Sequence, residues 1–71
     1  MYRLYRVFEG DKTEYGRHSS QSKAYLIKKA KELHLAYCKL PKQFQIPNCT
    51  KVTYIIKSDG NPVDSFTLDV K

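Results

Sequence analysis

One long stretch of helical periodicity, residues 20–40, constrains the fold of this chain more than any other feature. It reads SQSKAYLIKKAKELHLAYCKL. On a helical wheel one stripe collects Leu26, Ala30, Leu33, Tyr37 and Leu40, with Ile27 and His34 along its edge. The opposite side carries Lys28, Lys31, Glu32, Lys39 and Leu35. The pattern therefore predicts an amphipathic helix with an apolar side that packs on a core and a cationic side with one exposed leucine.

The residues that flank this stretch carry the signals that begin and end helices. Ser19, Ser20 and Ser22 each have a hydroxyl that can accept hydrogen bonds from the first free N–H groups of a helix. Pro41 cannot continue a helix, because its ring removes the N–H donor and clashes with the preceding turn. The predicted helix thus lies between two short-strand regions.

The N-terminal region predicts a β-hairpin. Residues 2–9 are rich in aromatic and aliphatic side chains without helical spacing, which is typical of a strand. Alternation places Tyr2, Leu4, Arg6 and Phe8 on one face and Arg3, Tyr5, Val7 and Glu9 on the other. Gly10 and Asp11 form a turn, so residues 12–18 are expected to return as a second strand, in which only Tyr15 has a side chain to bury.

The C-terminal half predicts a loop and a second hairpin. Residues 41–50 contain two prolines and the apolar pair Phe44 and Ile46, so we expect a loop that places one or two of these side chains in the core. The alternative is that this segment is the mobile part of the chain. Residues 51–58 and 63–70 are expected to be strands. Their apolar faces coincide only if the connection has an odd number of residues. A three-residue loop sets Tyr54 opposite Phe66, and a five-residue loop also satisfies the pattern.

The fold class that follows is α+β, in a single small basic domain over residues 1–71. We expect the element order ββαββ, with a small antiparallel sheet and one long amphipathic helix packed across one face. The other sheet face then stays partly open and is both aromatic and basic. It is expected to carry Thr53, Ile55, Lys57, Ser65 and Thr67. If Leu4 and Phe8 of the first strand point inward, it also carries Arg3, Tyr5 and Val7.

Charge is distributed unevenly along the chain. The 71 residues carry a net charge of +6. Residues 1–43 contain ten basic and four acidic side chains, whereas residues 44–71 contain three of each. A basic excess of this kind favours partners that are acidic, so we expect either nucleic acid or an acidic protein, and no small-molecule substrate. The pattern does not predict an oligomeric state.

The sequence also gives expectations about location and redox state. Residues 1–8 alternate and include two arginines, unlike the apolar region of a signal peptide, so we expect a cytoplasmic protein. No apolar run approaches the ~20 residues that span a bilayer, so we expect no membrane association. Cys38 and Cys49 are then expected to be reduced thiols, with a disulfide between them as the alternative.

No motif of catalysis or cofactor binding is present, so we expect a non-enzymatic protein with no catalytic residues, cofactor or metal. His34 is interpreted as a packed core histidine; the alternative is a zinc ligand together with Cys38 and Cys49. His18 precedes two serines, but helix capping explains those serines better than nucleophilic catalysis does. The acidic residues Glu9, Asp11 and Glu14 around the first turn are interpreted as solvated rather than as a metal site.

Two functions remain. The first is nucleic-acid binding, DNA or RNA, through a basic helix and a sheet face that carries arginine and tyrosine, with an accessory or regulatory role. The alternative is a protein-binding regulator or inhibitor, of the kind that phages and mobile elements use as accessory proteins, which docks on an acidic partner protein. The residues expected to bind the nucleic acid or the partner are Arg3, Tyr5, Arg6, Tyr15, Arg17, Lys23, Lys28, Lys29, Lys31, Leu35 and Lys39.

One resemblance supports the first of these functions. The basic hairpin that leads through SSQSKA into a lysine-rich helix, within residues 2–33, resembles the arm-type DNA-binding domain of phage integrases. The resemblance implies DNA binding by a sheet that enters the major groove. The chain departs from that domain in having no tryptophan and no Gly-Phe-Thr step before the helix, and in adding two strands after it.

Overall fold

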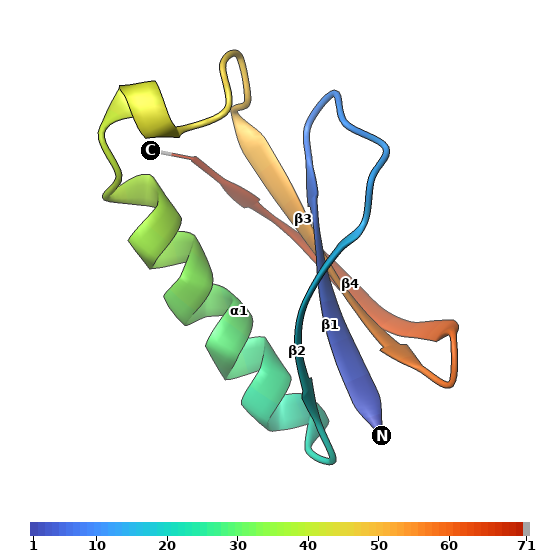
Figure 1. Ribbon diagram of the computed structural model, residues 1–71. Helices are drawn as coiled ribbons and strands as arrows, with labels where there is room; N and C mark the ends of the chain where they lie inside the picture. The colour runs from blue at the N-terminus through green and yellow to red at the C-terminus, as the bar shows by residue number, and fades with distance from the viewer. Residues whose placement is uncertain (71) are drawn as a thin grey trace.

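The computed structural model describes residues 1–70, and it shows a four-stranded antiparallel sheet with one α-helix on one of its faces (Figure 1). The strand order is β2-β1-β3-β4. The elements are β1 (Tyr2–Phe8), β2 (Tyr15–Ser20), α1 (Lys23–Cys38), the 3-10 helix η1 (Lys42–Phe44), β3 (Lys51–Ser58) and β4 (Asn61–Asp69). The α+β class is as predicted, whereas η1 adds an element that the predicted order does not contain.

Helix α1 is shorter than its sequence pattern at both ends. Ser22 is the N-cap, and its Oγ accepts a hydrogen bond from the Tyr25 N–H at 3.1 Å. Ser19 and Ser20, predicted as possible caps, belong instead to β2. At the C-terminal end the Gln45 side-chain amide donates to the free carbonyl of Leu40 at 2.9 Å. Leu40 therefore lies beyond the helix and is exposed, contrary to its predicted place in the apolar stripe.

The core forms between α1 and the face of the sheet that β1 and β3 provide. Its strand residues are Leu4, Phe8, Val52, Tyr54 and Ile56, and its helix residues are Leu26, Ala30 and Tyr37. These strand residues alternate in sequence, so they share one face, as predicted. Burying them against one helix leaves the residues between them on the opposite face.

The apolar stripe of α1 is rotated from its predicted position, because His34 is buried and Leu33 is only half-buried. The His34 ring fits because both of its nitrogens have partners. Its Nε2 lies 2.6 Å from the backbone oxygen of Asp69, which only accepts, so Nε2 carries a proton. In the neutral ring Nδ1 then accepts from the Tyr54 hydroxyl at 3.0 Å. The interpretation of His34 as a packed core histidine is confirmed.

The register of β3 and β4 is the one that a three-residue loop predicts, with Tyr54 opposite Phe66. The chain reaches this register by a different route. Strand β4 begins at Asn61 rather than Val63, and Asp59 and Gly60 alone form the turn, both with positive φ. An irregularity between Ile56 and Lys57 then shifts the pairing by one residue, which restores the common apolar face.

Two loop predictions are wrong. The return strand of the first hairpin begins at Tyr15 rather than Lys12, because a turn and an irregular segment precede it. In the segment after α1, Phe44 and Ile46 do not enter the core; the side chain of Phe44 is 66% exposed. Cys49 packs against the core instead. Side chains of η1 thus cover little of the sheet, and β4 ends beside this segment (Figure 1).

The first prediction tests the packing of α1. Leu26→Ala should lower the free energy of unfolding by about 2–5 kcal/mol, because it removes a fully buried side chain and leaves a cavity. Leu35→Ala is the matched control: the same change on the same helix, at a residue that is 60% exposed, should alter it by less than about 0.5 kcal/mol. Urea unfolding of both variants measures the difference. Equal losses would show that the helix presents a different face to the sheet.

Candidate functional site

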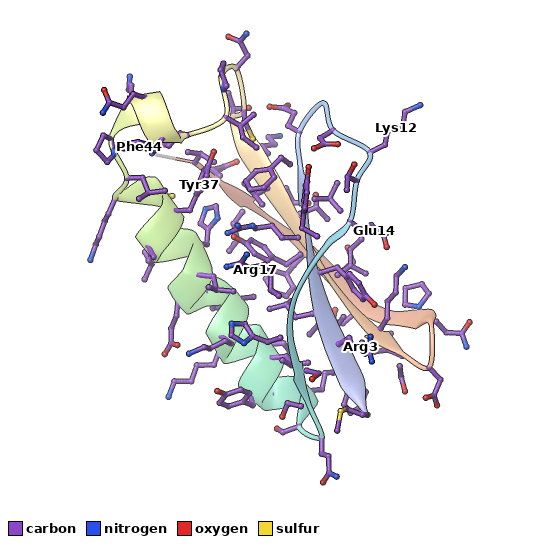
Figure 2. The ribbon with its side chains drawn as sticks, in the orientation of Figure 1. Arg3, Lys12, Glu14, Arg17, Tyr37 and Phe44 are labelled. Carbon is purple, nitrogen blue, oxygen red and sulfur yellow. The ribbon has the colours of Figure 1, made fainter. Side chains whose placement is uncertain are left out.

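The structure divides the predicted binding residues between opposite sides of the sheet. Arg3 and Tyr5 alternate with the buried Leu4, so they lie on the face away from α1. Arg6 lies on the α1 side, and so does Arg17, which lines a groove with residues of the helix. Figure 2 shows Arg17 between β2 and α1, with Arg3 on another part of the molecule. One rigid ligand cannot contact all of the predicted residues at once.

The open face of the sheet has few free positive charges. The Lys57 ammonium lies 5.1 Å from the centre of the Tyr5 ring and 2.6 Å from a carboxylate oxygen of Glu14. Thr53 and Thr67 hydrogen-bond to each other through their hydroxyls at 3.0 Å. The Tyr5 ring, predicted to stack on bases, thus already lies beside the ammonium of an ion pair between β3 and the loop before β2.

The positive charge gathers instead on β2, α1 and η1. From Tyr15 to Thr50 the only acidic residue is Glu32, which pairs with Lys29 at 3.5 Å. Lys23 pairs with Asp64 at 3.8 Å. Lys28, Lys31, Lys39 and Lys42 are exposed, and within residues 1–70 they form no ion pair. We call Arg17, Lys28, Lys31, Lys39 and Lys42 the cationic side.

Arg6 and Arg17 line a groove of about 200 Å³ between β2 and α1. The Arg6 guanidinium carbon lies 4.8 Å from the centre of the Phe8 ring and 5.8 Å from that of Tyr37. Its Nε is buried and, among the described residues, has no hydrogen-bond partner. Burial raises the pKa of the nearby Tyr54 hydroxyl, and the charges of Arg6 and Arg17 oppose this rise. Arg6 on β1 and Arg17 on β2 therefore contribute positive charge to the same groove.

Tyr15 is a binding candidate that the structure uses within its own hairpin. Its ring packs edge-on against Phe8, with the ring centres 6.1 Å apart. Its hydroxyl donates to the Asp11 carboxylate at 2.8 Å, and this bond is the first cause of its raised pKa. Tyr15 is thus a poor candidate for stacking on a base.

Sequence reasoning missed Tyr25 and Phe44. Tyr25 is 50% exposed and lies one helical turn from Lys28, so it is an aromatic ring on the cationic side. Phe44 lies on η1, two residues after Lys42, and points outward (Figure 2). Leu35 is exposed as predicted, and it borders a second groove that Leu68 of β4 also lines. The signal for Tyr25 was present, because it lies outside the apolar stripe.

The acidic residues of the first turn each have a structural partner. Glu9 accepts hydrogen bonds from the Thr50 N–H and hydroxyl, which lower its pKa. Asp11 accepts from the Thr13 N–H at 2.9 Å, and this bond lowers its pKa first. Glu14 pairs with Lys57. These three carboxylates connect loops to strands, so their roles are structural.

The remaining candidates for chemistry do not converge. Cys38 and Cys49 are free thiols. Within the described residues no group of three or more His, Cys, Asp or Glu side chains is arranged to hold a metal ion. Helix α1 is too short and too charged to cross a bilayer, and no other helix of residues 1–70 meets that requirement.

Comparisons with known proteins give no relative of this chain. No protein-family model matches it, and neither a curated protein nor a solved structure was found to be similar.

The second prediction concerns Glu9 and pH. Because the pKa of Glu9 is lower in the folded chain than its usual 4.5, its ionised form stabilises the fold above that pH. This contribution is lost as the pH falls through the lowered pKa. Glu9→Gln should therefore reduce the fall in melting temperature between pH 6 and pH 3. Glu32→Gln, on the outer side of α1, is the control, and an equal effect of both variants would contradict the role of Thr50.

Proposed function

We propose that this chain is a non-enzymatic nucleic-acid-binding module with an accessory or regulatory role. Its phosphate contacts come from the cationic side rather than from the open face of the sheet. The observation that supports this choice is the charge distribution: one acidic residue against seven basic residues between Tyr15 and Thr50. Cations that are not paired within the protein release counterions from a phosphate backbone when they bind it.

The spacing of the helix lysines suits a backbone contact. Lys28 and Lys31 lie three residues apart on α1, so they are neighbours on one side of the helix. Tyr25 lies three residues before Lys28 and offers a ring on which a base of a single strand can stack. Tyr5 is on the opposite side of the sheet, so we assign it no part in this interface. The proposal needs no cofactor.

The third prediction tests this surface by charge reversal. At low salt the protein should bind DNA, and the logarithm of its affinity should fall by about 0.9 per neutralised duplex phosphate per logarithm of salt concentration. Lys28→Glu with Lys31→Glu should weaken binding and reduce that slope. The control is Arg3→Glu with Lys51→Glu, which reverses two charges outside the cationic side. Fluorescence anisotropy with a labelled duplex and a labelled single strand measures both quantities.

Two results would contradict the proposal. The first is an absence of nucleic-acid binding at low salt, where the electrostatic contribution is largest. The second is a larger effect of the Arg3 and Lys51 pair than of the Lys28 and Lys31 pair, which would place the interface on the other side of the sheet.

A protein-binding regulator is the second candidate, favoured by Leu35. This side chain is 60% exposed in a surface rich in lysine, as a hydrophobic anchor for an acidic partner protein would be. In this case Leu35→Ala would weaken the complex more than any single lysine substitution does, and DNA would not compete for the protein. The anisotropy experiment separates the two candidates, because it measures binding to nucleic acid, which only the first candidate predicts.

A further inference from the structure

The groove between β2 and α1 joins two arginines that have no anionic partner among residues 1–70. Its other lining residues, Leu33, Ala36, Tyr37 and Leu40, carry no acidic group. Within residues 1–70 neither Arg6 nor Arg17 forms a salt bridge. Two guanidinium groups on one groove repel each other, and the partial burial of Arg6 adds a desolvation cost. An anion between them offsets the repulsion.

The position of Arg6 is fixed before any ligand arrives. The Phe8 and Tyr37 rings hold its guanidinium group, and the covered Nε limits its rotation. Its place on β1, in the interior of the sheet, limits backbone movement as well. A planar fork that packing holds in place loses little entropy when it binds an oxyanion. Arg17 supplies the second cation from the more exposed edge strand.

We propose that this groove is a binding site for one phosphate group, with Arg6 and Arg17 as its cationic ligands. The inference rests on the proposed function for the source of the phosphate, which is the backbone of a nucleic acid. Phosphate is favoured over carboxylate because its oxygens can accept hydrogen bonds from two guanidinium groups on different sides. The helix that forms one wall also carries Lys28, which is exposed and forms no ion pair within residues 1–70, so a neighbouring phosphate of the strand has a cation to contact. Lys31 borders the groove on the β4 side of the helix instead.

A structural role for Arg6 alone does not account for the groove. Cation–π contacts with Phe8 and Tyr37 explain why Arg6 is tolerated near the core. They do not explain the second arginine, Arg17, which lines the same groove and forms no salt bridge within residues 1–70. The site therefore predicts a response to phosphate that a merely structural arginine lacks.

The experiment follows the arginine Nε–H signals of the full chain by NMR while inorganic phosphate is added at constant ionic strength. The covered Nε–H of Arg6 gives a distinct signal, which phosphate should shift. Arg17→Gln should weaken phosphate binding about tenfold, the effect of losing one charge-assisted hydrogen bond. Lys28→Gln, on the outer side of α1, is the control and should change the affinity for phosphate by less than about twofold. Because Arg17 is exposed, its substitution is compatible with the fold.

Three results overturn the assignment. They are an Arg6 signal that phosphate does not move, equal phosphate binding by Arg17→Gln and the unmodified chain, and tighter binding of acetate than of phosphate. The last result would indicate a carboxylate ligand, and therefore an acidic peptide. Arg6→Lys, which keeps the charge but removes the planar fork, should also weaken binding, and a thermal melt checks that it folds.

The outcomes separate this site from the proposed function. If Arg17→Gln binds DNA as well as the unmodified chain does, while charge reversal on α1 weakens binding, the groove assignment is wrong and the nucleic-acid proposal stands. If phosphate binds in the groove but no nucleic acid binds at low salt, the site stands and the nucleic-acid proposal is wrong.

Discussion

The rest of the structure depends on the packing of one helix against one face of a four-stranded sheet. Fully buried residues from β1, β3 and α1 make up this contact. Apolar burial contributes about 25 cal/mol per Å². A small chain buries little apolar surface, so the loss of one core contact removes a large part of its stability. Strand alternation then sends Arg3 and Tyr5 to the far face, whereas the lysines of α1 stay in the helix layer. The location of the positive charge thus follows from the location of the core.

The polar groups in this contact make the packing specific. His34 on α1 connects Tyr54 of β3 to the backbone of Asp69 in β4, so one side chain ties the helix to two strands. The bond from His34 Nε2 occupies the backbone oxygen of Asp69 at the free edge of β4. Ser65 lies on this edge strand too, and its N–H donates to the Asp64 side chain at 2.8 Å. Edge groups that are already bonded are less available to pair with another strand.

Sequence patterns predicted the parts of the fold that depend on periodicity. The strand over residues 51–58, the pairing of Tyr54 with Phe66, the exposure of Leu35 and the α+β class all follow from apolar spacing. The ends of α1 could not be predicted in this way, because Ser19, Ser20 and Ser22 offer equivalent caps and only packing selects Ser22. Phe44 was placed in the core on hydrophobicity alone, but η1 turns its side chain outward. The predicted length of the second hairpin loop was wrong, because the bulge between Ile56 and Lys57 takes the place of one loop residue and keeps the register the same.

The sequence predicted which residues of the candidate site could bind a ligand, but not where they lie on the surface of the fold. The sequence shows that the basic excess lies before Phe44, but it does not show that β1 divides Arg3 from Arg6. That division requires the strand order and the face that α1 covers. Tyr25 was missed although its signal was present: it lies outside the apolar stripe and three residues before Lys28. The groove of Arg6 and Arg17 brings together two strands and a helix, and no local pattern predicts it.

The most direct test of the account is to map the bound surface by NMR, with ¹⁵N-labelled protein and a short DNA duplex at low salt. The central claim is that the helix layer, and not the open face of the sheet, contacts the nucleic acid. The account predicts that amide signals of Arg17, Tyr25, Lys28 and Lys31 shift as DNA is added, while those of Thr53 and Ile55 stay in place. Shifts confined to Thr53, Ile55 and their neighbours on the open face would contradict it.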